Sequence, residues 1–438
     1  MSEDFAARPL DGLRVVEVSS FVAAPLGGMT LAQLGADVIR VDPIGGGADI
    51  NRWPLADAEG GASLYWAGLN KAKRSLTVDL RSGRGQQLVC DLICDPERGS
   101  GIVLTNAGRL PWLSFEALSE RRPDLIHVQI DGKRDGSAAV DYTINAATGF
   151  PMITGPVGWD EPVNHVLPAW DVACGLYAAI ALLSAERRRR LTGVGSRIRV
   201  PLEDVALATA GNLGFLAEAQ VNRVDRPRIG NHLYGSLARD FQTRDGRRIM
   251  IVALTNRHWR DLLSVTGLTG VSRALEVELG IDLSTEAARY QHRAAIAALI
   301  EPWFAERNFE EAAAQLAASS VLWSVYRSFT EVIQDHLAAG PDRSLLTEID
   351  QPGVGRHLAP GSPIAIGEPD TARTAQRAPV LGEHTGHVLA NDLGLSPEHT
   401  AELLTAGVVA DAAVFTPEIT SSSDTSGSST FITTAGES

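Results

Sequence analysis

One carboxylate stands out as a residue that could do chemistry: Asp171, at the end of the segment Asn164–Asp171. A short apolar run ends at Pro168, and a long apolar helix is predicted to begin at the aspartate and to continue through Leu183. An aspartate at the N-cap of a helix accepts backbone N–H hydrogen bonds and lies at the positive end of the helix dipole. Both effects favour the ionised carboxylate, which can act as a nucleophile. The alternative is that Asp171 only caps the helix.

The first turns of that helix carry small side chains, at Ala173, Gly175, Ala178 and Ala179. Small residues allow another backbone or a ligand to come close to the helix. Cys174 lies between them, but no histidine in the neighbouring sequence would activate its thiol. We interpret it as a small buried apolar residue.

A second group of residues is positively charged. Lys71, Lys73 and Arg74 fall within four residues, just before a strand predicted at 76–80, and could hold an anionic ligand by charge-assisted hydrogen bonds. Asn106 follows a strand predicted at 102–105, and open α/β sheets bind ligands at the carboxyl ends of their strands. The alternative for the cations is a solvated surface loop.

The cysteines and histidines do not form a metal-ligand pattern. Cys90, Cys94 and Cys174 give neither a disulfide framework nor a zinc site, which is typical of a reducing cytoplasm. His384 and His387 are three residues apart on a helix predicted near 383–393, but no third ligand accompanies them. We therefore predict no metal site, and a structural or surface role for both histidines.

The elements that must position these residues begin with a βαβ unit. Residues 13–18 predict a strand, a helix begins at Pro25 and is stopped by Gly35, and residues 36–41 predict a second strand. This order implies a parallel sheet with a right-handed crossover. Asp42 ends the second strand as in a nicotinamide-binding domain, but the first turn, residues 19–25, lacks the glycines that admit a pyrophosphate. A nicotinamide dehydrogenase is therefore disfavoured.

The chain of 438 residues is longer than one hydrophobic core usually serves, so we expect two domains in an α/β protein. Residues 1–227 would form the first part of a Rossmann-like large domain, and 228–330 a smaller α+β domain. Residues 331–410 would return to the large domain, and 411–438 would be a disordered Ser/Thr-rich tail. Within the small domain, Phe241–Val252 predicts a hairpin about Asp245-Gly246. Residues 203–221 predict one long helix.

Charge and composition exclude several classes of protein. The net charge of −14 argues against a general nucleic-acid binder, whose affinity would rest on basic patches. The first residues lack the basic and apolar regions of a signal peptide. The apolar runs are too short or too interrupted to cross a membrane. We therefore expect a cytoplasmic protein.

Several segments resemble motifs of the class III CoA-transferase family, in the order that the family has them and across roughly residues 9–410. They are Pro9–Val15, Leu31–Arg40, Lys73–Leu76, Pro168–Asp171, Thr243–Gly246 and Gly382–Thr385. Other segments resemble a branch of the family that moves coenzyme A between the two carboxylates of one branched, unsaturated C5 dicarboxylate. These are Phe21–Met29, Asp42–Gly47, Trp66–Lys71 and Asn164–Leu167.

The resemblance implies an interlocked homodimer, a Rossmann-like large domain with a small domain, and a site in which Asp171 is the nucleophile. Coenzyme A would be part of the substrate rather than a permanently bound cofactor, and would lie against Phe21 and Ala23. The implied candidates for contacts to its phosphates and adenosine are Arg40, Lys73, Asn106 and Arg109. The expected partners are acyl-CoA and carboxylic acid substrates and a second copy of the chain.

One departure from the family pattern separates two chemistries. In the racemases of the family a histidine directly precedes the aspartate that corresponds to Asp141, and this chain has Val140 at that position. Racemisation needs a proton acceptor on each face of the substrate, which valine cannot supply. We therefore expect CoA transfer, with Asp141 either tuning the nucleophile or packing structurally.

Three functions stay open at this point. The chain transfers CoA within one dicarboxylate, transfers it between an acyl-CoA such as succinyl-CoA and another acid, or binds CoA without catalysis. A retained dicarboxylate would need a cation or hydroxyl group for its second carboxylate, and Arg52 and His165 are candidates that also have structural alternatives. The loop Gly230–Gly235 is either a cover that keeps water out or a connector.

Overall fold

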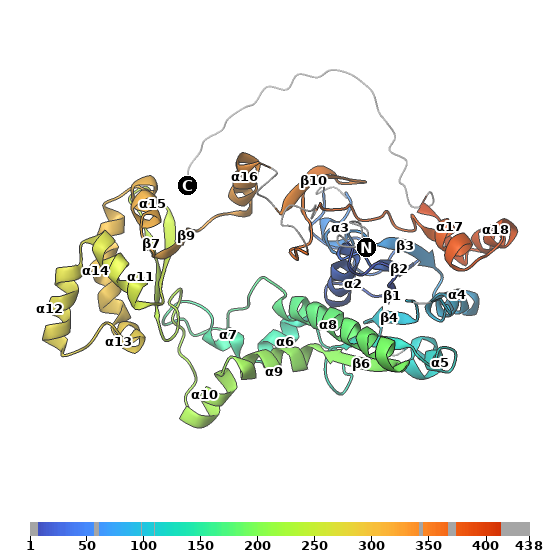
Figure 1. Cartoon of the computed structure of the whole chain (residues 1–438), viewed down its shortest axis with the longest axis horizontal. Coiled ribbons are helices and arrows are strands. Elements are labelled where there is room, and N and C mark those ends of the chain that lie inside the picture. The colour runs from blue at the N-terminus through green and yellow to red at the C-terminus, as the bar shows by residue number, and fades with distance from the viewer. Residues whose placement is uncertain are drawn as a thin grey trace, which may run out of the picture.

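The computed structural model describes residues 8–56, 61–97, 99–108, 110–340, 345–366 and 374–412. Its centre is a seven-stranded sheet in the order β12-β3-β2-β1-β4-β5-β6 (Figure 1). Every strand pair in it is parallel except β12 with β3, which is antiparallel. The strands are β1 (Arg14–Val18), β2 (Asp37–Pro43), β3 (Arg74–Val78), β4 (Ile102–Thr105), β5 (Ile126–Asp131), β6 (Ser196–Pro201) and β12 (Val409–Ala410).

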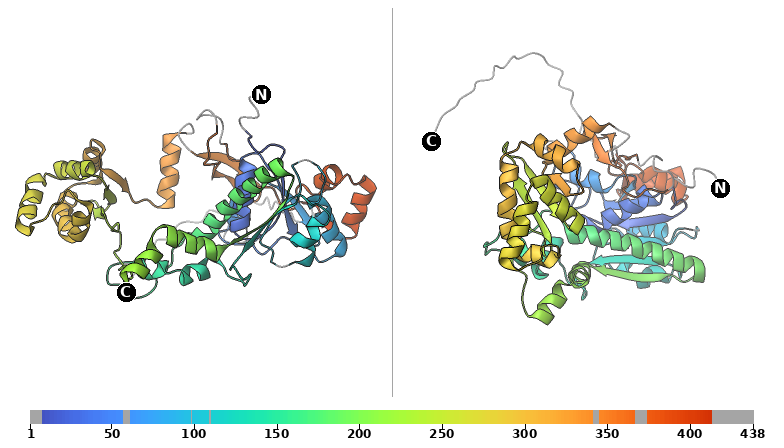
Figure 2. Two further views of the ribbon diagram at one scale, coloured as in Figure 1. Left: turned by 60° about the horizontal axis from the view of Figure 1, so that its bottom comes forward. Right: turned by 60° about the vertical axis from the view of Figure 1, so that its left-hand side comes forward.

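Helices cover both faces of this sheet because its central strands are apolar on both sides. Successive side chains of a strand point to opposite faces, so Val15 and Val16 belong to two different cores. Val15 packs under α2 (Ala23–Gln33), α8 (Ala169–Thr192) and α9 (Leu202–Asn212). Val16 belongs to the core that contains α4 (Gly83–Ile93) and Leu118 of α5 (Phe115–Ser119). Figure 2 shows α8 lying along the sheet.

Shorter elements complete this body. They are α3 (Leu64–Leu69), η1 (Pro111–Leu113), α6 (Asp141–Ala147), α7 (Phe150–Ile153), α17 (Thr385–His387), the π-helical turn η3 (Val388–Asp392) and α18 (Pro397–Thr405). The single helix predicted at 203–221 was wrong. Gly214 adopts a left-handed φ of 82° and divides the segment into α9 and α10 (Phe215–Asn222).

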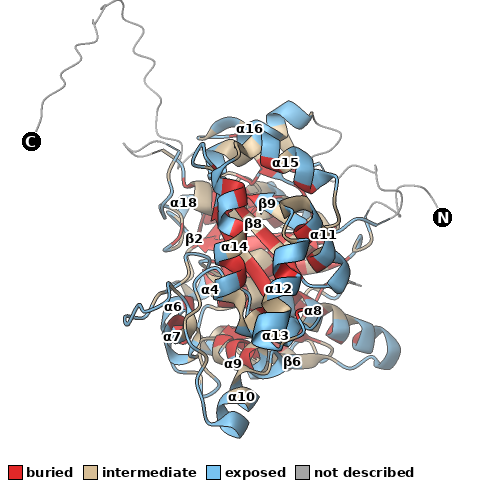
Figure 3. Ribbon diagram, turned by 90° about the vertical axis from the view of Figure 1, so that its left-hand side faces the viewer, coloured by how far each residue is buried: buried red, intermediate tan, exposed pale blue. Residues whose placement is uncertain are grey.

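A second body has its own core around an antiparallel sheet, β7 (Leu237–Gln242), β8 (Arg248–Ala253) and β9 (Leu322–Val325). The predicted hairpin is confirmed, since β7 pairs with β8 and Gly246 sits in the turn at a φ of 82°. Five helices pack beside this sheet, and Figure 3 shows exposed residues along the helices and buried residues in the strand β8 behind them. They are α11 (Asn256–Thr266), α12 (Thr269–Leu279), α13 (Glu286–Gln291), α14 (Arg293–Ala305) and α15 (Phe309–Ala317).

The chain returns toward the large sheet through α16 (Phe329–Ala339) and the hairpin β10 (Leu346–Gln351) and β11 (Gly355–Pro360), as Figure 1 shows. It then adds β12 beside β3. The predicted α/β architecture with a parallel βαβ unit is confirmed. The predicted tail beyond residue 412 lies outside the described residues.

Helix α8 corrects one expectation about apolar runs. Among the described residues it is the one helix long and apolar enough to cross a membrane by length and composition. The prediction that no apolar run meets this test was therefore wrong. Core helices meet the same test, and α8 contributes Ala178, Leu182 and Ala185 to the core beside the sheet.

Candidate active site

Asp171 lies in the first turn of α8, but it is not the cap that the sequence predicted. The helix begins at Ala169 with Pro168 at the N-cap, and no side chain of the cap accepts a hydrogen bond there. The carboxylate of Asp141, at the start of α6, caps the helix instead, although it is far from α8 in the sequence. Its Oδ2 atom accepts hydrogen bonds from the backbone N–H groups of Trp170, at 2.7 Å, and of Asp171, at 3.1 Å. The Asp171 side chain is therefore not used to cap its own helix.

The surroundings of Asp171 raise its pKa to about 7. Burial is the largest cause, the negative charge of Asp141 adds to it, and the guanidinium of Arg52 opposes it. The sequence predicted an ionised carboxylate at neutral pH, but burial and the charge of Asp141 favour the protonated form more than the sequence indicated. Near pH 7 both the neutral and the ionised carboxyl group are populated.

Asp141 is only 2% exposed, and it brings the start of α6 against the start of α8. Its neighbour Asn145 accepts a hydrogen bond from the indole N–H of Trp170 at 3.2 Å. Val140, at the N-cap of α6, is 59% exposed and has no group that accepts a proton. The sequence offered two roles for Asp141, and the geometry combines them: it holds the first turn of α8 and adds negative charge near Asp171.

The small residues of α8 allow the backbone of α2 to come close. A Cβ atom added at Gly175 would lie 2.4 Å from the carbonyl oxygen of Ala23. One added at Gly27 would lie 2.9 Å from the carbonyl oxygen of Gly175. Since Gly175 follows Asp171 by four residues on the same helix face, this crossing places the first turn of α2 next to the candidate nucleophile.

Phe21 and Ala23, the expected neighbours of coenzyme A, lie at that end of α2. Ala23 is the first residue of the helix and is buried. Phe21 precedes it in a left-handed conformation with a φ of 64°, and its backbone N–H donates to Oδ2 of Asp49 at 3.0 Å. Its ring is 38% exposed. The strained backbone at Phe21 is thus fixed by a buried carboxylate and leaves the ring accessible.

Arg52 extends this group toward α3. Its guanidinium carbon lies 5.5 Å from the centroid of the Phe21 ring and 5.1 Å from that of Tyr65. Burial raises the pKa of the Tyr65 hydroxyl to about 12 against the opposing charge of Arg52, and Asp171 and Asp49 contribute less, so the hydroxyl stays protonated. His165, the other residue considered for a second carboxylate, packs edge-on against Trp170 with a centroid distance of 6.1 Å.

Arg40 and Lys73 are not at a surface where they could meet coenzyme A. Arg40 is fully buried, and its guanidinium donates to Asp42, Asp49, Asn70 and the carbonyl of Ser19. The Lys73 ammonium donates at 2.8–2.9 Å to three acceptors: Glu17, Asn70 and the carbonyl of Pro25. Phosphate contacts through these two side chains would break these buried bonds. The predicted anion-binding loop is therefore contradicted at Lys73, whereas the contacts to coenzyme A that the family resemblance implies for Arg40 and Lys73 stay predictions.

The alternative of a solvated loop is contradicted as well. Lys71 is 5% exposed, and burial lowers its pKa to about 8. Arg74 donates to Asp37 and Asp392, which joins β3 to the C-terminal segment. These cations fasten the loop to the body of the protein, and the same network holds Asp49 against Phe21.

Asn106 lies at the carboxyl end of β4 and braces the loop that leads to Phe21. Its side-chain oxygen accepts from the Ser20 N–H at 3.0 Å, and its amide donates to the Ser20 carbonyl at 2.8 Å. Arg109 lies outside the described residues. The structure thus brings together Asp171, Asp141, Phe21 and Ala23, and assigns bracing roles to Arg40, Lys73 and Asn106.

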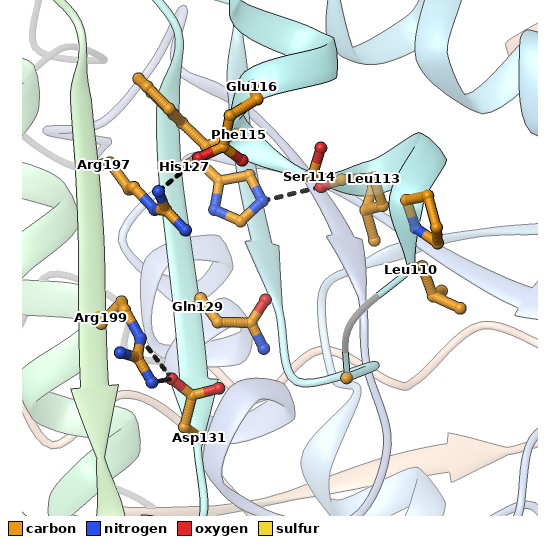
Figure 4. Close-up of a pocket in the computed structure, with 12 residues that line it drawn as sticks. Leu110, Leu113, Ser114, Phe115, Glu116, His127, Gln129, Asp131, Arg197 and Arg199 are labelled. Atoms are coloured by element: carbon orange, nitrogen blue, oxygen red, sulfur yellow. Dashed lines mark hydrogen bonds and ion pairs between the residues drawn. The ribbon is translucent and has the colours of Figure 1, made fainter. Parts of the chain in front are cut away.

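A cavity of about 330 Å³ lies beside α5, and Asp171 is not among the residues that line it (Figure 4). It is bordered by the loop after β4, by α5, and by the β5 and β6 side chains His127, Gln129, Asp131, Arg197 and Arg199. Its two arginines pair with carboxylates, Arg197 with Glu116 and Arg199 with Asp131. The lining residues of β5 alternate with Ile126, Val128 and Ile130, which pack in the core with α8, so the cavity lies on the opposite face of the sheet from α8.

Three parts of the site had no local signal in the sequence. The capping of α8 by Asp141 joins residues 30 apart. Nor does the sequence show that Tyr65 lies beside Arg52, or that Asp49 holds Phe21. The predicted interpretation of Cys174 is confirmed, because it is fully buried and burial raises the pKa of its thiol to about 12.

Comparison with known proteins shows to which family this chain belongs. The family model described as CoA-transferase family III matches residues 10–385. The 2-methylfumaryl-CoA isomerase of Chloroflexus aurantiacus is 49% identical over 401 residues, which cover 92% of this chain and 98% of that protein. A formyl-CoA:oxalate CoA-transferase of Rhodopseudomonas palustris is 29% identical, with 92% of this chain and 98% of that protein covered. The crystal structure of a CAIB/BAIF family protein from Brucella suis has a TM-score of 0.72 and 27% identity, and covers 88% of this chain and 100% of that one. The chain belongs to CoA-transferase family III.

Proposed function

We propose that this enzyme converts 2-methylfumaryl-CoA (mesaconyl-C1-CoA) into 3-methylfumaryl-CoA (mesaconyl-C4-CoA) by moving coenzyme A between the two carboxyl groups of one molecule. The observation that carries the proposal is the 49% identity, over nearly the whole length of both chains, to an enzyme named for this reaction. The half-buried carboxyl group of Asp171 at the start of α8 supports it.

In the proposed mechanism the ionised Asp171 attacks the thioester carbonyl, which gives a mixed anhydride and releases the CoA thiolate. The thiolate attacks the aspartyl carbonyl, leaving an aspartyl-CoA thioester and the free dicarboxylate. The other carboxylate of the same acid then attacks the aspartyl-CoA, and the thiolate returns to the new anhydride at the substrate carbonyl. Each bond broken is matched by one formed, and Asp171 is regenerated. These reaction steps therefore need no metal or redox cofactor.

The surroundings of Asp171 suit these steps in two ways. Asp141 holds the first turn of α8, so the carboxyl group of Asp171 keeps a fixed orientation toward α2. Burial of the carboxyl group limits the access of water, which would hydrolyse an anhydride. The oxyanions need hydrogen-bond donors, and the backbone at the start of α2, beside Ala23 and without a side-chain cap, is our candidate.

Coenzyme A enters this scheme as part of the substrate. Its thioester end would pass Phe21 and Ala23, and its nucleotide end would lie beyond the carboxyl ends of β1 and β4, with Asn106 and Arg109 as the contacts that the family resemblance implies. Arg40 and Lys73 would then act indirectly, by fixing the loop that carries Phe21. We place the reaction in the cytoplasm.

A second copy of the chain is the proposed protein partner. Along α8, the apolar side chains of Leu176, Tyr177 and Ile180 are 44%, 48% and 60% exposed, and Val166 just before the helix is 93% exposed. Exposed apolar side chains clustered at one site indicate an interface. A homodimer would cover this surface next to Asp171, and light scattering of the purified protein measures its mass in solution.

Transfer between two different acids is the competing function, because relatives at 27–29% identity are named for it, including the succinyl-CoA:glutarate CoA-transferase of Mus musculus. The test is to incubate the pure enzyme with mesaconyl-C1-CoA and no other acid. We expect the C4 isomer to accumulate. If it forms only after succinate or another acid is added, or not at all, the intramolecular proposal is wrong.

A further inference from the structure

The isomerisation requires the enzyme to hold a dicarboxylate whose second carboxylate does not react. A free carboxylate brought into a partly desolvated site needs a cation or several hydrogen-bond donors. The cation must also stay free of other carboxylates, since a paired cation has little charge to offer. This condition separates Arg52 from Arg40, which is paired with carboxylates.

Arg52 meets the condition among the described residues. No carboxylate of that part of the chain lies within ion-pair distance of it, whereas Arg40 pairs with Asp42 and Asp49. The Arg52 side chain is exposed, and its guanidinium lies over the rings of Phe21 and Tyr65. A guanidinium that lies over aromatic rings can still donate hydrogen bonds from its N–H groups to a ligand.

The placement of Arg52 relative to Asp171 follows from a chain of contacts. The Phe21 backbone is fixed by Asp49, which the buried Arg40 holds in turn. Phe21 stands at the start of α2, and Ala23 there touches α8 at Gly175, one turn after Asp171. The same conclusion follows from electrostatics, because the charge of Arg52 lowers the pKa that burial raises at Asp171.

We infer that Arg52, held between Phe21 and Tyr65, binds the carboxylate of the substrate that is not reacting. In the first half of the reaction this is the C4 carboxylate, and in the second half it is the C1 carboxylate. One fixed cation beside one fixed nucleophile therefore serves both ends of the acid, and the acid exchanges its ends between the two halves. The Tyr65 hydroxyl, which stays protonated, is a second donor to the same carboxylate.

This inference deepens the proposed function and rests on it. His165 is the weaker candidate for the same role, because its ring packs edge-on against Trp170.

The test compares two substrates in single-turnover formation of the aspartyl-CoA adduct: mesaconyl-C1-CoA and its C4 methyl ester, which lacks the distal charge. We expect the wild-type enzyme to form the adduct about 10- to 100-fold faster from the charged substrate, in the range of a charge-assisted hydrogen bond. Arg52→Gln should react with both at similar rates, and Arg52→Lys should keep part of the preference. Arg273→Gln, an exposed arginine of α12, is the matched control and should behave as wild type.

The experiment distinguishes failure of the inference about Arg52 from failure of the proposed function. If wild type does not isomerise mesaconyl-C1-CoA, the proposed function fails. If wild type isomerises but does not distinguish acid from ester, or if folded Arg52→Gln keeps the preference, the inference about Arg52 is wrong while the function stands. Should Arg52→Gln not fold, the ester comparison in wild type and the partial preference of Arg52→Lys still decide the matter.

Discussion

The raised pKa of Asp171 predicts that this residue lowers the stability of the fold at neutral pH. The folded chain holds its carboxyl proton up to about pH 7, whereas an unfolded aspartate releases its proton near 3.8. Between these values the unfolded state binds fewer protons, so the free energy of unfolding falls as pH rises. Above pH 7 both states are ionised and the loss is complete.

The perturbation that removes this loss is Asp171→Asn, which keeps the shape of the side chain but cannot ionise. The difference in pKa corresponds to about 4 kcal/mol at about 1.4 kcal/mol per unit. Because part of the carboxyl group reaches solvent, we expect the variant to be more stable than wild type by about 2 to 4 kcal/mol at pH 8.

Urea unfolding followed by circular dichroism at pH 5, 6, 7 and 8, at one protein concentration, measures this gap. It should grow with pH up to about 7 and then level off. Asp160→Asn, at an exposed carboxylate, should show no such growth. A gap that does not change with pH, or a wild type that is the more stable protein at pH 8, would refute the reasoning.

Three further results are expected. Asp141→Asn removes a negative charge near Asp171. The acidic limb of the pH profile of kcat/KM, expected near pH 7 in wild type, should therefore move down by about one pH unit. An unmoved limb would show that Asp141 does not act on the nucleophile. Gly175→Ala places a Cβ atom against the Ala23 carbonyl and should lower the free energy of unfolding by about 1–3 kcal/mol. Gly270→Ala, with open space around it, should not lower it. Equal effects of the two substitutions would contradict the close crossing of α2 and α8. Lys73→Met leaves the buried Glu17 without its closest cation and should cost about 3–5 kcal/mol, and a loss below about 1 kcal/mol in urea unfolding would argue against a buried pair.

The parallel sheet and its first βαβ unit could be predicted because they follow from local patterns. The strand predicted at 13–18, the stop at Gly35 and the second strand each need only neighbouring residues. The hairpin about Asp245-Gly246 is local in the same way. The break at Gly214 was missed because the segment 203–221 is otherwise compatible with one helix.

The electrostatics of the site could not be predicted because they depend on residues far apart in the chain. The sequence placed Asp171 at a helix start, which favours ionisation, but it did not show how deeply the carboxyl group is buried or that Asp141 lies beside it. The cations Lys71 and Lys73 look like surface residues until Glu17 and the carbonyl of Pro25 are known to face Lys73.

The central claim concerns a covalent bond at Asp171, and peptide mass spectrometry of the enzyme quenched during turnover of mesaconyl-C1-CoA tests it most directly. The mechanism predicts coenzyme A in thioester linkage to the peptide that contains Asp171, converted to a hydroxamate by hydroxylamine and absent from Asp171→Asn. Isomer formation with that peptide unmodified throughout, or a folded Asp171→Ala protein that isomerises as fast as wild type, would contradict it.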